Sequence, residues 1–204
     1  MRRGLAVALI LTFAGVFSVN AYAKSKPRGE PPAISEVKSA YARCQAVREL
    51  PTTKRVLLVL IRNQPKEQGH WEVPSPGTEQ TADEQMTVYV ADEKVIAVDL
   101  YDAGLSGDWT QVVTHCFRTD GSLAFLLAVL RTFYGDVKVE DRFYFDHTGK
   151  QIRTLRSVFD LSTNKRVHPK KGDFMAHEPQ IFHTTDEVLN AIGRGNVFGT
   201  RQTK

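Results

Sequence analysis

The sequence predicts an α+β protein, mainly antiparallel β, in which an N-terminal helix packs on a curved meander sheet of about seven or eight strands. Three observations lead to this class. Apolar residues recur at helical spacing near the N-terminus and again near the C-terminus. Between these regions lie short runs rich in Val, Ile, Phe and Tyr, separated by turn residues. No segment repeats with a fixed period, and the turn–strand units have unequal lengths, as in an ordinary meander.

The first 23 residues have the pattern of a secretory signal peptide. Arg2 and Arg3 precede an apolar run from Leu5 to Val19, and Ala21-Tyr22-Ala23 places small residues at the −3 and −1 positions of a cleavage site. The apolar run is short for a membrane span. We therefore expect an exported protein, periplasmic or extracellular, that keeps no transmembrane segment after cleavage. A twin-arginine signal and an uncleaved anchor are the alternatives.

The rest of the chain divides into three parts. Residues 24–32 hold three prolines and a glycine but no large apolar side chain, which predicts a flexible leader. Residues 33–193 are expected to form a single globular domain, and residues 194–204 a disordered tail. Without its first 23 residues, which hold two arginines and no acid, the chain carries 25 basic and 23 acidic residues. This near balance, with no basic stripe, argues against nucleic acid as a partner.

Cys44 and Cys116 are the two cysteines of the chain. In an exported protein they are expected to form a disulfide. Cys44 lies on the apolar stripe of the predicted N-terminal helix, so the bond would join that helix to the sheet. A catalytic cysteine with His115 as its base is disfavoured, because adjacent residues of a strand point to opposite faces.

The N-terminal helix is expected to be capped by Ser35 and to end before Pro51. A second, short helix is expected from a cap at Thr185 or Asp186 to Gly193. Strands are expected at Val56–Ile61, Met86–Val90, Val95–Leu100, Trp109–Arg118, residues 123–134, Val137–Phe145 and Ile152–Leu161. Trp71 and Val73, between Gly69 and Pro74, are candidate anchors of an edge strand.

Two turn signals support these strands. Asp120-Gly121 is typical of a tight hairpin, and Asp146–Lys150 reads as a short loop with Gly149 in the left-handed conformation. Residues 123–134 leave an alternative open. Their alternation favours a strand, whereas their leucines and alanines favour a helix.

The C-terminal histidines are the candidates for chemistry. His168, His177 and His183 lie near Asp173 and Glu178. Their spacings of nine and six residues match neither a helical zinc motif nor a zinc finger, so solvent-facing loop histidines are favoured and no cofactor is expected. His177 and Glu178 remain the first candidates for acid–base catalysis, and the three histidines with Asp173 for a metal.

Asp99, Asp102 and Asp108 surround a glycine-bearing loop but lack the ligand spacing of an EF-hand. They are interpreted as a solvated strand end.

Because no motif indicates a reaction, the sequence favours a non-enzymatic binding or envelope-associated module. Its sheet face or a groove would take an apolar or extended ligand, or a partner strand. The two helices and residues 168–182 are the material that can cover the apolar face of the sheet, and incomplete cover would leave a groove. The alternatives are a metal-assisted or acid–base hydrolase that uses the C-terminal histidines, and a structural or assembly protein.

Overall fold

The computed structural model describes residues 31–61, 69–75, 84–168 and 177–198. Its centre is an antiparallel sheet of nine strands in the order β2-β1-β3-β4-β5-β6-β7-β8-β9. The sheet and the helix packed on it confirm the predicted α+β, mainly antiparallel class. The predicted signal peptide and residues 24–30 of the predicted leader lie outside the described residues.

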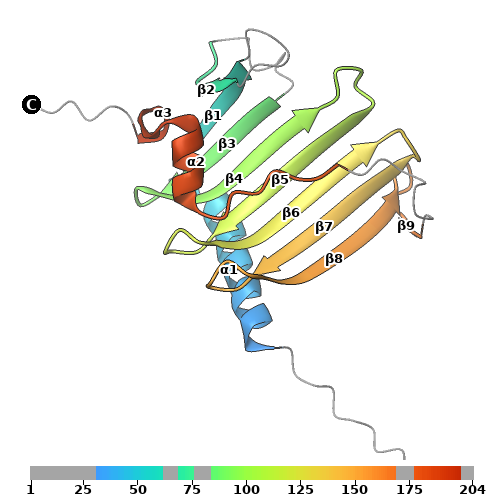
Figure 1. The fold of residues 1–204 in the computed structure, drawn as a ribbon, viewed down its shortest axis with the longest axis horizontal. Helices are drawn as coiled ribbons and strands as arrows, with labels where there is room; N and C mark the ends of the chain where they lie inside the picture. The colour runs from blue at the N-terminus through green and yellow to red at the C-terminus, as the bar shows by residue number, and fades with distance from the viewer. Residues whose placement is uncertain (1–30, 62–68, 76–83, 169–176, 199–204) are drawn as a thin grey trace, which may run out of the picture.

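Figure 1 shows how the elements follow one another along the chain. The strands are β1 (Lys54–Ile61), β2 (His70–Glu72), β3 (Glu84–Ala91), β4 (Lys94–Ala103), β5 (Trp109–Phe117), β6 (Leu123–Thr132), β7 (Val137–Phe145), β8 (Gln151–Asp160) and β9 (Arg166–Val167). The helices are α1 (Pro32–Arg48), α2 (Thr185–Ile192) and α3 (Arg194–Phe198).

Helices cover both faces of the sheet: α1 lies behind it in Figure 1 and α2 in front. The alternation of strand residues explains how one sheet serves two cores. Ala97 and Cys116 pack with α1, whereas Val98, next to Ala97, packs in the cluster that includes α2. The expectation of a single apolar face was therefore wrong.

Strand β6 is buried on both faces of the sheet. Residues Leu123, Ala124, Phe125 and Leu126 are all at most 3% exposed. A strand that is buried on both faces reads as a continuous apolar run, which resembles a buried helix in sequence. The preference for a strand at residues 123–134 is confirmed.

Helix α1 begins earlier than the sequence predicted. Its first residue is Pro32, and the capping position is held by Pro31, which makes no side-chain capping bond. A proline in the first turn costs no hydrogen bond, and its fixed φ angle suits a helix start. Ser35 therefore lies inside the helix and is not its cap.

The C-terminal region packs on the opposite face from α1. The Thr184 hydroxyl oxygen accepts a hydrogen bond of 3.2 Å from the Glu187 amide and caps α2, one residue before the predicted cap. Residues 194–198 contradict the expected disordered tail, because they form α3 with Val197 fully buried. The Lys54 ammonium also donates to the Val197 carbonyl at 2.6 Å. Residues 199–204 lie outside the described residues.

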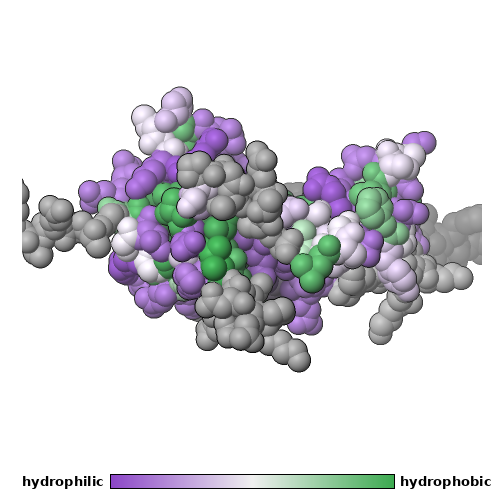
Figure 2. All heavy atoms as spheres, turned by 90° about the horizontal axis from the view of Figure 1, so that it is seen from above, coloured by the Kyte–Doolittle hydropathy of each residue, from purple (hydrophilic) through white to green (hydrophobic). Residues whose placement is uncertain are grey.

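The two ends of the sheet differ in the loops and side chains that they hold. At one end, Leu105 in the β4–β5 loop and Phe133 and Tyr134 in the β6–β7 loop are exposed hydrophobic residues. Figure 2 looks onto this end and shows hydrophobic patches among hydrophilic side chains. The opposite end holds the β3–β4 turn and the start of the β5–β6 turn, close to α1. No helix within the described ranges is long and apolar enough to cross a membrane.

Candidate functional site

A cleft of about 230 Å³ lies between the C-terminal half of α1 and the ends of β3, β4 and β5. This volume is slightly below the ~300 Å³ at which typical small-molecule sites begin. The apolar part of its lining consists of Cys44, Val47, Ala91, Val95, Ile96 and Phe117. The polar part consists of Arg43, Asp92, Lys94, Arg118 and Thr119.

Two of the strand pairs beside the cleft contain a β-bulge near this end of the sheet. The register between β3 and β4 shifts at Tyr89/Val90, and the register between β5 and β6 shifts at Cys116/Phe117. A bulge bends its strand and redirects the side chains that follow it. Phe117, directly after the second bulge, lines the cleft and also packs in the cluster that includes α2, whereas Cys116 packs with α1.

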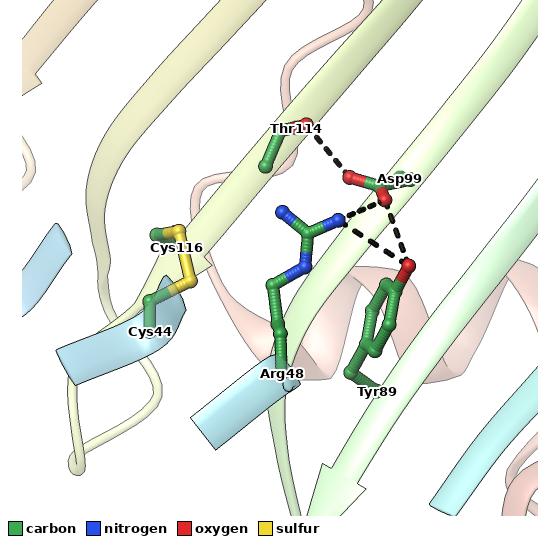
Figure 3. The surroundings of a disulfide bond; sticks show 6 residues. All are labelled: Cys44, Arg48, Tyr89, Asp99, Thr114 and Cys116. Atoms are coloured by element: carbon green, nitrogen blue, oxygen red, sulfur yellow. Dashed lines mark hydrogen bonds and ion pairs between the residues drawn. A yellow bond between two sulfur atoms is a disulfide. The ribbon is translucent and has the colours of Figure 1, made fainter. Parts of the chain in front are cut away.

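The disulfide between Cys44 and Cys116 fixes the helical wall of the cleft (Figure 3). It joins α1 to β5, with the two Cα atoms 5.8 Å apart, and confirms the predicted pairing. Both cysteines are buried. One turn earlier in α1, the Tyr41 ring packs against Phe125, with the ring centroids 4.4 Å apart. The wall formed by α1 is therefore held by a covalent bond and by packing.

A polar cluster fixes the end of α1, one turn beyond the disulfide (Figure 3). The Asp99 carboxylate accepts hydrogen bonds from the Arg48 guanidinium, from the Tyr89 hydroxyl at 3.0 Å and from the Thr114 hydroxyl at 2.7 Å. Burial raises the pKa of Tyr89, so its hydroxyl stays protonated and donates to Asp99. Asp99 is therefore not part of a solvated strand end, because it is the anion that pairs α1 with β4.

Arg118 holds the β5 side of the cleft through four partners. Its Nε donates to Glu36 of α1 at 3.0 Å. Its two terminal nitrogens donate to the carbonyl oxygens of Leu123 at 2.8 Å and Phe145 at 2.6 Å, and one of them also lies 3.4 Å from the Ser122 hydroxyl. Only 8% of this side chain is exposed, so Arg118 is a structural cation rather than a free one.

His177, a sequence-predicted candidate, lies on the other face of the sheet. Its Nε2 is 3.5 Å from the Asp102 carboxylate, and its ring packs on Trp109 with centroids 4.5 Å apart. The side-chain amide of Gln111 donates to the His177 carbonyl at 3.2 Å. Burial, followed by the nearby Glu84 charge, raises the pKa of Asp102. His177 thus has a carboxylate partner, as an acid–base residue needs.

The other candidates do not gather around His177. His168 is exposed after β9, Glu178 is exposed next to His177, and Asp173 lies outside the described residues. His183 packs edge-on against Phe145, 5.7 Å between ring centroids, and its backbone amide donates to Glu187. Among the residues that the structure describes, no three His, Cys, Asp or Glu side chains converge as metal ligands would.

His115, which was disfavoured above as the base of a catalytic cysteine, is fully buried on the side of the sheet that α2 covers. Its Nε2 accepts a hydrogen bond of 3.2 Å from the Phe182 amide, and its ring packs against that of Phe182. Burial lowers the pKa of His115 to about 4. His115 therefore ties the segment before α2 to the sheet as a neutral side chain.

The cleft and the Asp99 cluster are the features that sequence reasoning missed. Their members come from α1 and from strands some 40 to 70 positions later, so no local motif joins them. The available signal was Cys44, because a disulfide prediction also predicts which segments lie beside α1.

No family model, curated protein or solved structure matches this chain.

Proposed function

We propose that the protein is an exported, non-enzymatic binding module whose cleft beside the Cys44–Cys116 disulfide receives a small apolar ligand. The observation that carries this proposal is the cleft itself, which is about 230 Å³ in volume and has Val47, Val95 and Phe117 in its lining. Small-molecule sites are concave and mostly apolar, with few polar groups.

The interactions around the cleft fix its walls, which favours the binding of a ligand. The disulfide and the Asp99 cluster hold the α1 wall of the cleft, and Arg118 holds the β5 side. A site whose walls are already fixed loses little conformational entropy when a ligand enters. Export rests on the signal-like first 23 residues, and a disulfide is compatible with an oxidising compartment.

The test fills the cleft. In Val47→Trp a large ring from α1 would occupy the space, whereas Ala46→Trp places the same ring on an exposed neighbouring position outside the cleft. Binding of a neutral hydrophobic dye is followed by fluorescence. We expect wild type and A46W to bind and V47W to lose at least ten-fold in affinity. Equal binding by all three, or no binding by wild type, would refute the proposal.

A second candidate function is an acid–base hydrolase with His177 as the base, which the contact of His177 with Asp102 favours. The test measures turnover of a panel of ester and phosphoester substrates by the His177→Gln and His147→Gln variants. His147 lies in an exposed hairpin loop and serves as the control position. Turnover that is lost only in H177Q would support the enzyme. Native mass spectrometry of the same samples would reveal a bound metal, or a defined oligomer that favours an assembly role.

A further inference from the structure

Two cationic side chains at the cleft have no partner among the residues that the structure describes. Arg43 of α1 and Lys94 at the start of β4 both line the cleft and are exposed. Neither side chain makes a hydrogen bond or an ion pair with any residue that the structure describes. They belong to elements about 50 positions apart in the sequence, and the cleft is where these elements meet.

The remaining charges of the cleft leave a positive balance. Arg118 is compensated by Glu36, at 3.0 Å. Asp92 is the one acid in the cleft lining and offsets one of the two free cations. The Thr119 hydroxyl is exposed there and can donate a hydrogen bond. The cleft therefore presents cationic and hydroxyl donors beside an apolar floor.

We propose that the ligand of this cleft is a small amphipathic anion, with a carboxylate or similar head group at Arg43 and Lys94 and a short apolar chain against Val47 and Phe117. This inference rests on the proposed function, because it specifies the ligand of the same cleft. A charged acceptor makes stronger hydrogen bonds to cations than a neutral one does. An apolar ligand without a negative group would leave the excess positive charge of the cleft uncompensated.

The experiment compares octanoate with octanol, which share an alkyl chain but differ in charge, by isothermal titration at low salt. The test variant is the double change Arg43→Gln and Lys94→Gln. The matched control is Arg131→Gln with Lys165→Gln, which removes the same charge from exposed residues at the opposite end of the sheet. Exposed positions are chosen so that all variants keep the fold.

We expect wild type and the control to bind octanoate about 2- to 30-fold more tightly than octanol, the range expected for two exposed ion pairs. The test variant should bind both ligands with the affinity that octanol has for wild type. Equal affinities of wild type for octanoate and octanol would overturn this inference and leave the apolar ligand intact. So would a preference for octanoate that survives in the test variant. Failure of both ligands to bind wild type would overturn the proposed function and this inference together.

Discussion

Reducing the Cys44–Cys116 disulfide tests how the helical wall of the cleft is held. The bond closes a loop between residues 72 positions apart. In the chain-entropy model, releasing a loop of that length lowers the free energy of unfolding by about 4 kcal/mol at 25 °C. Reduction leaves both side chains in place, so it isolates the cross-link from the packing of the two cysteines.

The assay is urea unfolding of oxidised and reduced wild-type protein, followed by circular dichroism and tryptophan fluorescence. With a urea slope of about 2 kcal/mol per molar, the midpoint should fall by about 2 M on reduction. The double variant Cys44→Ala with Cys116→Ala should unfold near the reduced midpoint or below it, and should not respond to reductant. Oxidised and reduced wild type that unfold within about 0.5 M of each other would refute the reasoning.

Three further predictions concern the interactions around the cleft and the second face. Arg48→Met and Asp99→Asn should each lower the free energy of unfolding by about 2 kcal/mol. The double variant should lose less than the sum of the two, because the two groups form one pair. Additive losses in urea unfolding would contradict this. Burial holds the pKa of His115 at about 4, so the unfolded chain binds an extra proton between pH 6.5 and pH 4. Stability contributed by the neutral ring should therefore fall by about 3 kcal/mol as pH drops through that window, and in His115→Gln this part of the pH dependence should vanish; an unchanged profile would count against it. Gly121→Ala should destabilise the protein more than Gly149→Ala does. Both positions have positive φ angles (+86° and +81°), but only at Gly121 would a Cβ atom lie close to another side chain, 2.6 Å from the Thr185 hydroxyl oxygen. Equal losses of stability in thermal unfolding would show that Thr185 moves away from the Cβ atom without cost.

The meander could be predicted because its signals are local. Gly121 and Gly149 adopt the positive φ angles that their turns require, and the strands between the turns alternate or run apolar as the sheet demands. Cys44 could be placed against the sheet because it lies on the apolar stripe of its helix. These features depend on residues close together in the sequence, which is where periodicity carries information.

The site could not be predicted because its contacts are distant in sequence. Asp99 looks like any polar residue of a half-exposed strand until Arg48 is placed beside it. His177 gained its partner from Asp102, 75 positions earlier, and not from the neighbouring histidines. Residues 194–198 were expected to be part of a disordered tail, but they form a short helix that is stabilised by burying Val197.

The most direct test of ligand binding in the cleft is a methyl NMR titration of wild-type protein with octanol. The methyl groups of Val47 and Val95, which line the cleft, should shift in a saturable way. Those of Val139 and Val158, in a separate cluster on β7 and β8, should stay unchanged. Shifts centred on Val139 and Val158, or no saturable shift at Val47 and Val95, would contradict the account.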